Sequence, residues 1–146
     1  MIEGLIFLDV NIPMYAAGQP HPYREPCTWL LTQVARGRIA AAIDTEIIQE
    51  VLYRYGALQR WEIAVTMANS LIELIPVIFP IRSSEAQLSV ELFKQYAHQG
   101  PTARDVIHVA VMRNNGLSRI VTTDEHFERF EGIKRLDPLL LFSQAN

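Results

Sequence analysis

The sequence has few of the features that mark secreted or membrane proteins. Its one cysteine, Cys27, cannot form an internal disulfide, so we expect a reducing compartment and a packing role for the thiol. The most apolar stretch, residues 71–81, is broken by a glutamate and two prolines and is far shorter than the ~20 residues of a membrane-spanning helix. Glu3 and the lack of a basic cluster near it argue against a signal peptide. We therefore expect a cytoplasmic protein with no membrane association.

Positive charge is also scarce. The formal net charge is −3, the isoelectric point is near 5.8, and Lys94 and Lys134 are the only lysines. This balance argues against a protein whose main task is to bind nucleic acid by neutralising phosphates. It leaves open an enzyme that meets phosphates through bound cations, because unliganded carboxylates count as negative in the total. Repeats, linkers and composition shifts are missing too, so residues 1–146 are expected to form a single domain.

Short apolar runs alternate with helical patterns along the chain. Strands are predicted at 5–8, 38–43, 76–81, 118–124 and 134–138; helices at 27–37, 46–58, 60–75, 83–100 and 101–116; a loop at 18–26; and a short helical turn at 125–130. This alternation indicates an α/β fold with a central parallel sheet covered on both faces, a three-layer α/β/α arrangement. The apolar stripe from Trp61 to Ile72 is expected to face the core, a second subunit being the alternative.

Two aspartates end predicted strands. Asp9 follows the apolar run Leu5–Leu8, and Asp124 follows the run RIVTT. Each can be interpreted as a cap or turn residue, since aspartate begins helices well. Each can equally be a ligand, because binding sites in parallel sheets lie beyond the carboxyl ends of the strands. The two residues alone do not decide between these interpretations.

Asp105 is the most informative acid. It lies in a helix that is apolar on nearly every side, with Val109 and Met112 following it at i+4 and i+7. A buried carboxylate needs a partner, because an unpaired buried charge costs several kcal/mol. That partner can be a capping box with Thr102, or Arg104, or a bound cation. We favour the cation, since a buried acid that faces a site is a functional candidate.

Glu50 is less informative by itself. It lies at the edge of the apolar arc of its helix and four residues before Arg54, so an exposed ion pair explains it without any ligand. His108 lies on the mostly apolar helix of Asp105 and is expected to be structural. Neither Cys27 nor the four histidines show the spacing of a zinc site.

The four acids indicate more together than apart. Asp9, Glu50, Asp105 and Asp124 all lie at strand ends or near helix starts, which point to one edge of a parallel sheet. Converging carboxylates repel by about 1–4 kcal/mol per close pair, so their convergence implies a counter-ion. Oxygen ligands suit Mg²⁺ or Mn²⁺. We predict that the four acids hold one or two such ions and act in catalysis. Asn11 and Thr122 are either turn and strand residues or hydrogen-bond partners that orient these ligands.

The same residues carry a resemblance to a known family. The sequence resembles the PIN-domain ribonucleases, including the toxins of type II toxin–antitoxin pairs, over essentially the whole chain. The resemblance lies in four segments: FLDVNIPMY with Asp9, TEIIQEVLYRY with Glu50, TARDVIHVAVMRNNG with Asp105, and RIVTTDEHF with Thr122 and Asp124. It implies a sheet of about five parallel strands and cleavage of single-stranded RNA that depends on Mg²⁺ or Mn²⁺. A homodimer and an inhibitory antitoxin protein are further implied partners.

Two other functions fit parts of the pattern. A haloacid-dehalogenase-like phosphohydrolase also places an acid after the first strand, but it needs D-x-D, and Asn11 stands at the second position. A catalytically inactive PIN-type module that binds RNA or protein would be favoured if one acid were missing or if metal did not stabilise the fold.

Overall fold

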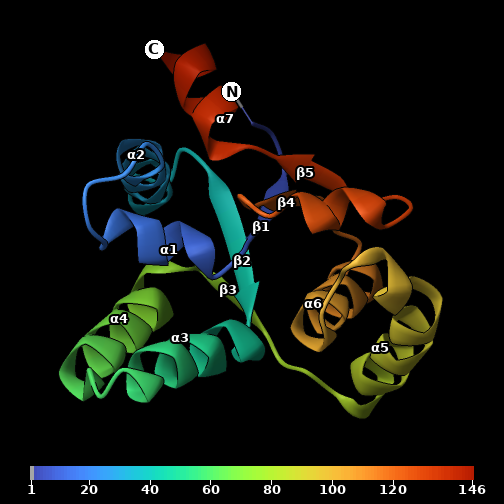
Figure 1. Cartoon of the computed structure of the whole chain (residues 1–146). Coiled ribbons are helices and arrows are strands. Elements are labelled where there is room, and N and C mark those ends of the chain that lie inside the picture. Colours follow the sequence, from blue (N-terminus) through green and yellow to red (C-terminus); the bar gives the residue numbers. More distant parts are fainter. Residues whose placement is uncertain (1) are drawn as a thin grey trace.

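A five-stranded parallel sheet runs through the middle of the computed structural model, which describes residues 2–146 (Figure 1). The strand order is β3–β2–β1–β4–β5, and all four neighbouring pairs are parallel. The strands are β1 (Leu5–Leu8), β2 (Ala40–Asp44), β3 (Val77–Phe79), β4 (Arg119–Val121) and β5 (Lys134–Leu136). The predicted α/β class and the five parallel strands are confirmed.

Helices cover both faces of this sheet, which gives the predicted three layers. Figure 1 shows α1, α2 and α4 on the left of the sheet and α5 and α6 on its right. Within residues 2–146 the helices are α1 (Asn11–Ala16), α2 (Arg24–Ala35), α3 (Thr45–Ala57), α4 (Trp61–Leu74), α5 (Ser83–Tyr96), α6 (Ala103–Asn114) and α7 (Pro138–Ala145), with 3₁₀ turns η1 (Ala97–Gln99) and η2 (Glu125–Arg129). In this part of the chain no helix combines the length and the apolar character needed to cross a membrane.

The central strands are apolar because both of their faces are covered. Ile6, Phe7 and Leu8 in β1 and Ile120 and Val121 in β4 are buried almost completely. Continuous apolar runs of this kind are typical of parallel strands that contact helices on both sides. This is why the sequence predicts these two strands well.

The order of the strands reverses at β1. From β1 the chain moves outward to β2 and β3 on one side, and then returns to β4 and β5 on the other. Such a reversal leaves a crevice at the carboxyl ends of the two central strands, where ligands bind in open α/β sheets. The amide of Asp9 donates to the carbonyl of Val121 at 3.1 Å, which extends the β1–β4 pairing up to this crevice.

The structure corrects three expectations about helices. Helix α1, directly after Asp9, and α7 near the end of the chain were not predicted, and α2 begins at Arg24, inside the expected loop. All three are compatible with the prolines in the sequence, because a proline is tolerated in the first turn of a helix. The two missed helices are also short, at six and eight residues, and so show little periodicity.

The prediction for the stripe on α4 is wrong for its largest side chain. Trp61 is 65% exposed, and Val65 and Ile72 are also more than half exposed, whereas Ala64 and Ala68 are buried as expected. Helix α4 packs through a face that also includes Met67 and Leu71, and the centre of this face lies roughly 70° around the helix from Trp61, at 100° per residue. The apolar arc is thus wider than the face that the core covers.

Candidate metal centre

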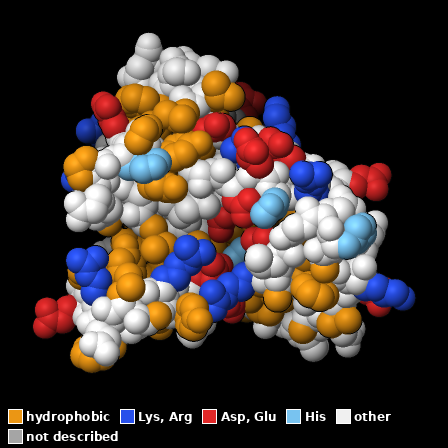
Figure 2. All heavy atoms as spheres, in the orientation of Figure 1, with side chains coloured by type: hydrophobic (Ala, Val, Ile, Leu, Met, Phe, Trp, Pro, Cys, Tyr) orange, Lys and Arg blue, Asp and Glu red, His pale blue; other side chains and the backbone are white. Residues whose placement is uncertain are grey.

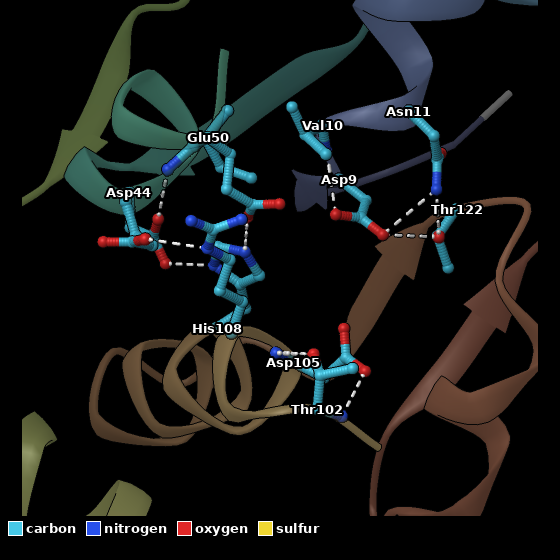
Figure 3. Close-up of polar contacts among 12 residues, drawn as sticks. Asp9, Val10, Asn11, Asp44, Glu50, Thr102, Asp105, His108 and Thr122 are labelled. Atoms are coloured by element: carbon cyan, nitrogen blue, oxygen red, sulfur yellow. Dashed lines mark hydrogen bonds and ion pairs between the residues drawn. The ribbon is translucent and has the colours of Figure 1, made fainter. Parts of the chain in front are cut away.

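The four predicted acids line one pocket at the carboxyl edge of the sheet. Its volume is about 310 Å³, and its lining includes Asp9, Glu50, Asp105, Asp124 and Asn11. Asp9 directly follows β1, Glu50 lies on α3 and Asp105 in the first turn of α6, whereas Asp124 lies in the segment after β4 and Asn11 at the start of α1. In Figure 3 the carboxylates of Asp9, Glu50 and Asp105 point toward a common space. The topology therefore brings together residues that are up to 115 positions apart (124 − 9).

Asp9 is buried and firmly held. Its Oδ1 accepts a hydrogen bond from the amide of Val10 at 2.8 Å, and its Oδ2 accepts from Thr122 Oγ1 at 2.7 Å and Asn11 Nδ2 at 3.2 Å. Burial raises the pKa of the Asp9 carboxyl, against the opposing effects of His108 and of the bonds from Thr122 and Val10. Its side chain is oriented in advance, and its negative charge is poorly compensated.

Thr122 connects the ends of the two central strands. Besides donating to Asp9, its Oγ1 lies 3.1 Å from Asn11 Nδ2 and accepts from the amide of Asp124 at 3.0 Å. The amide oxygen of Asn11 accepts from the Thr123 amide at 3.3 Å. These bonds fix the geometry between the Asp9 and Asp124 backbones. Neither Asn11 nor Thr122 acts only as a turn or strand residue.

Asp105 serves as a cap and faces the pocket at the same time. The Thr102 amide donates to Asp105 Oδ2 at 2.8 Å, and the Asp105 amide donates to Thr102 Oγ1 at 3.3 Å, which forms a capping box. Burial and the negative charge of Asp124 raise the pKa of the Asp105 carboxyl, although the bonds from Thr102 oppose this. Arg104, considered above as a partner of Asp105, instead pairs with Glu46 at 3.3 Å.

The carboxylate of Glu50 is held in place by a buried histidine. His108 Nε2 lies 2.6 Å from Glu50 Oε1, and His108 Nδ1 lies 2.7 Å from Asp44 Oδ2 (Figure 3). All three side chains are less than 5% exposed. The ion pair with Arg54 also exists, but at 3.8 Å and from a half-exposed side chain. The strongest contacts of Glu50 are therefore with His108.

His108 carries the positive charge of this buried group. Burial lowers the pKa of His108, but the charges of Asp44 and Asp9 and the bonds to Asp44 and Glu50 outweigh it and hold the pKa well above its ordinary value. Because both ring nitrogens contact carboxylates, His108 has no free nitrogen lone pair for a metal ion. It acts as a support for Glu50. The sequence placed it correctly in the core but gave no sign of its contact with Asp44, which lies 64 positions earlier.

Asp124 also combines two roles. Its Oδ1 accepts from the His126 amide at 2.9 Å and caps η2, while the side chain lines the pocket. The ring of His126 lies 3.3 Å from the same oxygen and is half-exposed. Sequence reasoning did not single out His126, although the spacing Asp124-x-His126 is short enough to bring the two side chains together.

The donor set fits a hard divalent cation. Ligand atoms of Asp9, Glu50 and His108 lie within 4.8 Å of one another, and those of Asp105, Asp124 and His126 form a second such group. Carboxylate oxygens dominate both groups, and His108 is already engaged. Oxygen donors of this kind suit Mg²⁺ or Mn²⁺ better than zinc or copper. The raised pKa values of Asp9 and Asp105 indicate that the site gains from added positive charge.

Comparison with known proteins identifies the family of the chain. A family model described as "PIN domain" matches residues 6–133. The chain belongs to the PIN domain family. Among curated relatives, Ribonuclease VapC13 of Mycobacterium tuberculosis is 32% identical over 132 residues, which cover 90% of this chain and 99% of the relative. Ribonuclease VapC23 of the same species is 30% identical over 120 residues, covering 82% and 93%.

Solved structures of other proteins share the fold at low sequence identity. VapBC-1 from nontypeable Haemophilus influenzae superimposes with a TM-score of 0.68 at 15% identity, covering 92% of this chain and 98% of that one. DNA-bound VapBC from Salmonella typhimurium gives a TM-score of 0.66 at 20% identity, covering 92% and 99%. At such identities the likeness concerns the fold alone.

Proposed function

We propose that this PIN-domain protein is an endoribonuclease that cleaves single-stranded RNA and depends on Mg²⁺ or Mn²⁺. The observation that carries the proposal is the meeting of Asp9, Glu50, Asp105 and Asp124 in one pocket of about 310 Å³. The curated relatives that span nearly the whole chain are named as ribonucleases. All four acids are present, which argues against an inactive module.

Each side chain has a distinct task in this proposal. A divalent ion bound there would supply a more acidic water and neutralise charge on the phosphate. Asp9 and Glu50, together with Asp105 and Asp124, are the carboxylates that would hold it. Thr122 and Asn11 hold the Asp9 carboxylate in one orientation, so little side-chain reorganisation is needed when substrate binds.

The direct test is cleavage of a labelled single-stranded RNA with Mn²⁺, with Mg²⁺ and with EDTA. We expect metal-dependent cleavage by the wild type and its loss in Asp9→Asn and Glu50→Gln. Glu73→Gln is the matched control, because Glu73 is an exposed acid on α4 outside the pocket. Cleavage that survives in EDTA, or in the double variant Asp9→Asn and Asp105→Asn, would contradict the proposal.

We further propose that the protein is the toxin of a toxin–antitoxin pair and acts on RNA in the cytoplasm. Structures of similar fold are described as VapBC complexes or as toxin–antitoxin complexes. An apolar groove of about 670 Å³ between α1, α2 and α4 offers a surface for an antitoxin; its lining includes Ala16, Leu31, Ile63, Met67 and Leu71. Induced expression should arrest growth, and Asp9→Asn should abolish the arrest. Unimpaired growth with active protein would favour a housekeeping nuclease.

A homodimer is part of the same proposal. Leu58, Trp61 and Val65 are each more than half exposed around the α3–α4 turn and form an apolar surface suited to a second copy. Sedimentation velocity on wild type and Trp61→Ser checks this. A wild-type monomer at micromolar concentration would contradict it.

A further inference from the structure

Two arginines share the acidic pocket. Arg54 from α3 and Arg104 from α6 line it together with the four acids. Both side chains are partly exposed, at 49% and 37%. Figure 2 shows blue basic side chains directly beside the red carboxylates at the centre of this face. Since the protein as a whole is negative, this places local positive charge at the edge of the metal centre.

The structure positions Arg104 but leaves part of it free. Its Nε pairs with Glu46 Oε1 at 3.3 Å, and its guanidinium carbon lies 4.6 Å from the centre of the Tyr53 ring. A cation above an aromatic face is held with its plane oriented. Because the ion pair with Glu46 is made through Nε, the two terminal nitrogens keep their donors for another acceptor.

Arg54 is held more loosely. Its Nη2 lies 3.8 Å from Glu50 Oε2, beyond hydrogen-bond distance, and Glu50 already has a close partner in His108. A weak, half-exposed ion pair of this kind contributes little to stability. The five donors of the guanidinium group therefore remain available near the mouth of the pocket.

We propose that Arg54 and Arg104 form a clamp for a phosphate of the RNA strand next to the bond that is cut. The paired N–H donors of a guanidinium group match two oxygens of a phosphodiester. Two such groups at the mouth of one pocket can hold the strand against the metal centre. The four carboxylates would otherwise repel the RNA backbone. The clamp rests on the proposed ribonuclease function and assigns its substrate contact to two residues.

The clamp makes a quantitative prediction for binding without metal. In EDTA, where cleavage does not occur, binding of a labelled single-stranded RNA is measured by fluorescence anisotropy at several salt concentrations. Each phosphate contact contributes a slope of about −0.7 to the dependence of log K on log salt. Arg54→Gln and Arg104→Gln should each make the slope less steep by about 0.7. Between roughly 50 and 200 mM salt, wild-type binding should weaken about sevenfold more than binding by the double variant.

Matched variants separate a clamp from a general charge effect. Arg38→Gln removes the same charge just before β2, at the amino ends of the strands and away from the pocket. This variant should change the slope by much less. Arg54→Lys and Arg104→Lys keep the charge but lose the paired N–H donors of the guanidinium group. The slope of log K against log salt should therefore stay the same while the affinity for RNA falls. Circular dichroism checks that each variant is folded.

The outcomes distinguish the clamp from the ribonuclease activity. If wild type cleaves RNA and the Arg54 and Arg104 variants have the same slope as Arg38→Gln, the clamp is wrong and the nuclease stands. If the slopes change as expected but no metal supports cleavage, Arg54 and Arg104 contact a phosphate of bound RNA, but the nuclease is wrong and with it the placement of that phosphate beside a cut bond. Wild type that does not bind RNA in EDTA overturns the clamp directly.

Discussion

Replacing His108 with phenylalanine tests the support beneath Glu50. The ring of His108 lies between two buried carboxylates, at 2.7 Å from Asp44 and 2.6 Å from Glu50. Phenylalanine fills similar space but removes the positive charge, so Asp44 loses its ion-pair partner and Glu50 keeps only the 3.8 Å pair with Arg54. Removing one partner of a buried ion pair costs about 3–5 kcal/mol. Asp44 also caps α3 by accepting from the Ile47 amide at 3.0 Å, so the start of the helix that carries Glu50 should loosen as well.

The expected change in melting temperature follows from chain length. With about 2.1 cal/mol/K per residue, the unfolding entropy of 146 residues is about 0.3 kcal/mol/K. A loss of about 3–5 kcal/mol should therefore lower Tm by about 10–16 °C, measured by scanning calorimetry without metal.

A double-mutant cycle decides whether the ion pair is responsible. Asp44→Asn, His108→Phe and the two together should give a coupling free energy of about 1–3 kcal/mol, because the second change costs less once the pair is broken. A coupling below about 0.5 kcal/mol, or a Tm shift of only a few degrees, would refute the argument that His108 compensates these acids.

Three further predictions concern the metal site, a glycine and an acid outside the pocket. Mn²⁺ at about 100 times its Kd should add about 2.7 kcal/mol of stability, or about 9 °C in Tm, in wild type but not in Asp105→Asn, as thermal melts will show. Gly100→Ala should lower stability and cleavage together, because φ is +114° there and the new Cβ would lie 2.9 Å from His126 Nε2; an unchanged melt and rate would refute this contact. Hydrogen bonds from Arg82, Ser84 and Asn114 lower the pKa of Glu85 to about 2, so its stabilising effect should be full above about pH 4.5 and lost as pH falls toward 2. Urea unfolding at pH 3 and 6 should show that Glu85→Gln loses less free energy of unfolding on going to pH 3 than the wild type does. Equal losses in the two proteins would contradict the assignment.

The sequence predicts the central strands and the long helices because each has strong local signals. β1 and β4 are short, apolar and buried on both faces, and α3 begins at an aspartate whose side chain bonds the helix. The misplaced side chain, Trp61, shows the limit of such reasoning. Periodicity shows that a helix is apolar on one arc, but the width of the contact with α3 decides which part of that arc is covered.

The acids show a different limit of prediction from the sequence. From sequence, cap and ligand stand as alternative interpretations of Asp105 and Asp124, yet both residues cap and both face the pocket. A carboxylate has two oxygens and can bond a backbone amide with one while the other stays available. The role of His108 was not predictable, since its two partners come from positions 64 and 58 residues away.

The strand order has a consequence for the synthesis of this protein. Asp9 is oriented by Thr122, which is made 113 residues later, and β4 must be inserted beside β1 before the two can meet. A nascent chain therefore carries Asp9 and Glu50 long before the pocket can close around them. For the nuclease proposed above, this order delays activity until β4 has been synthesised. Fragments released early by a stalled ribosome would lack β4 and the pocket with it.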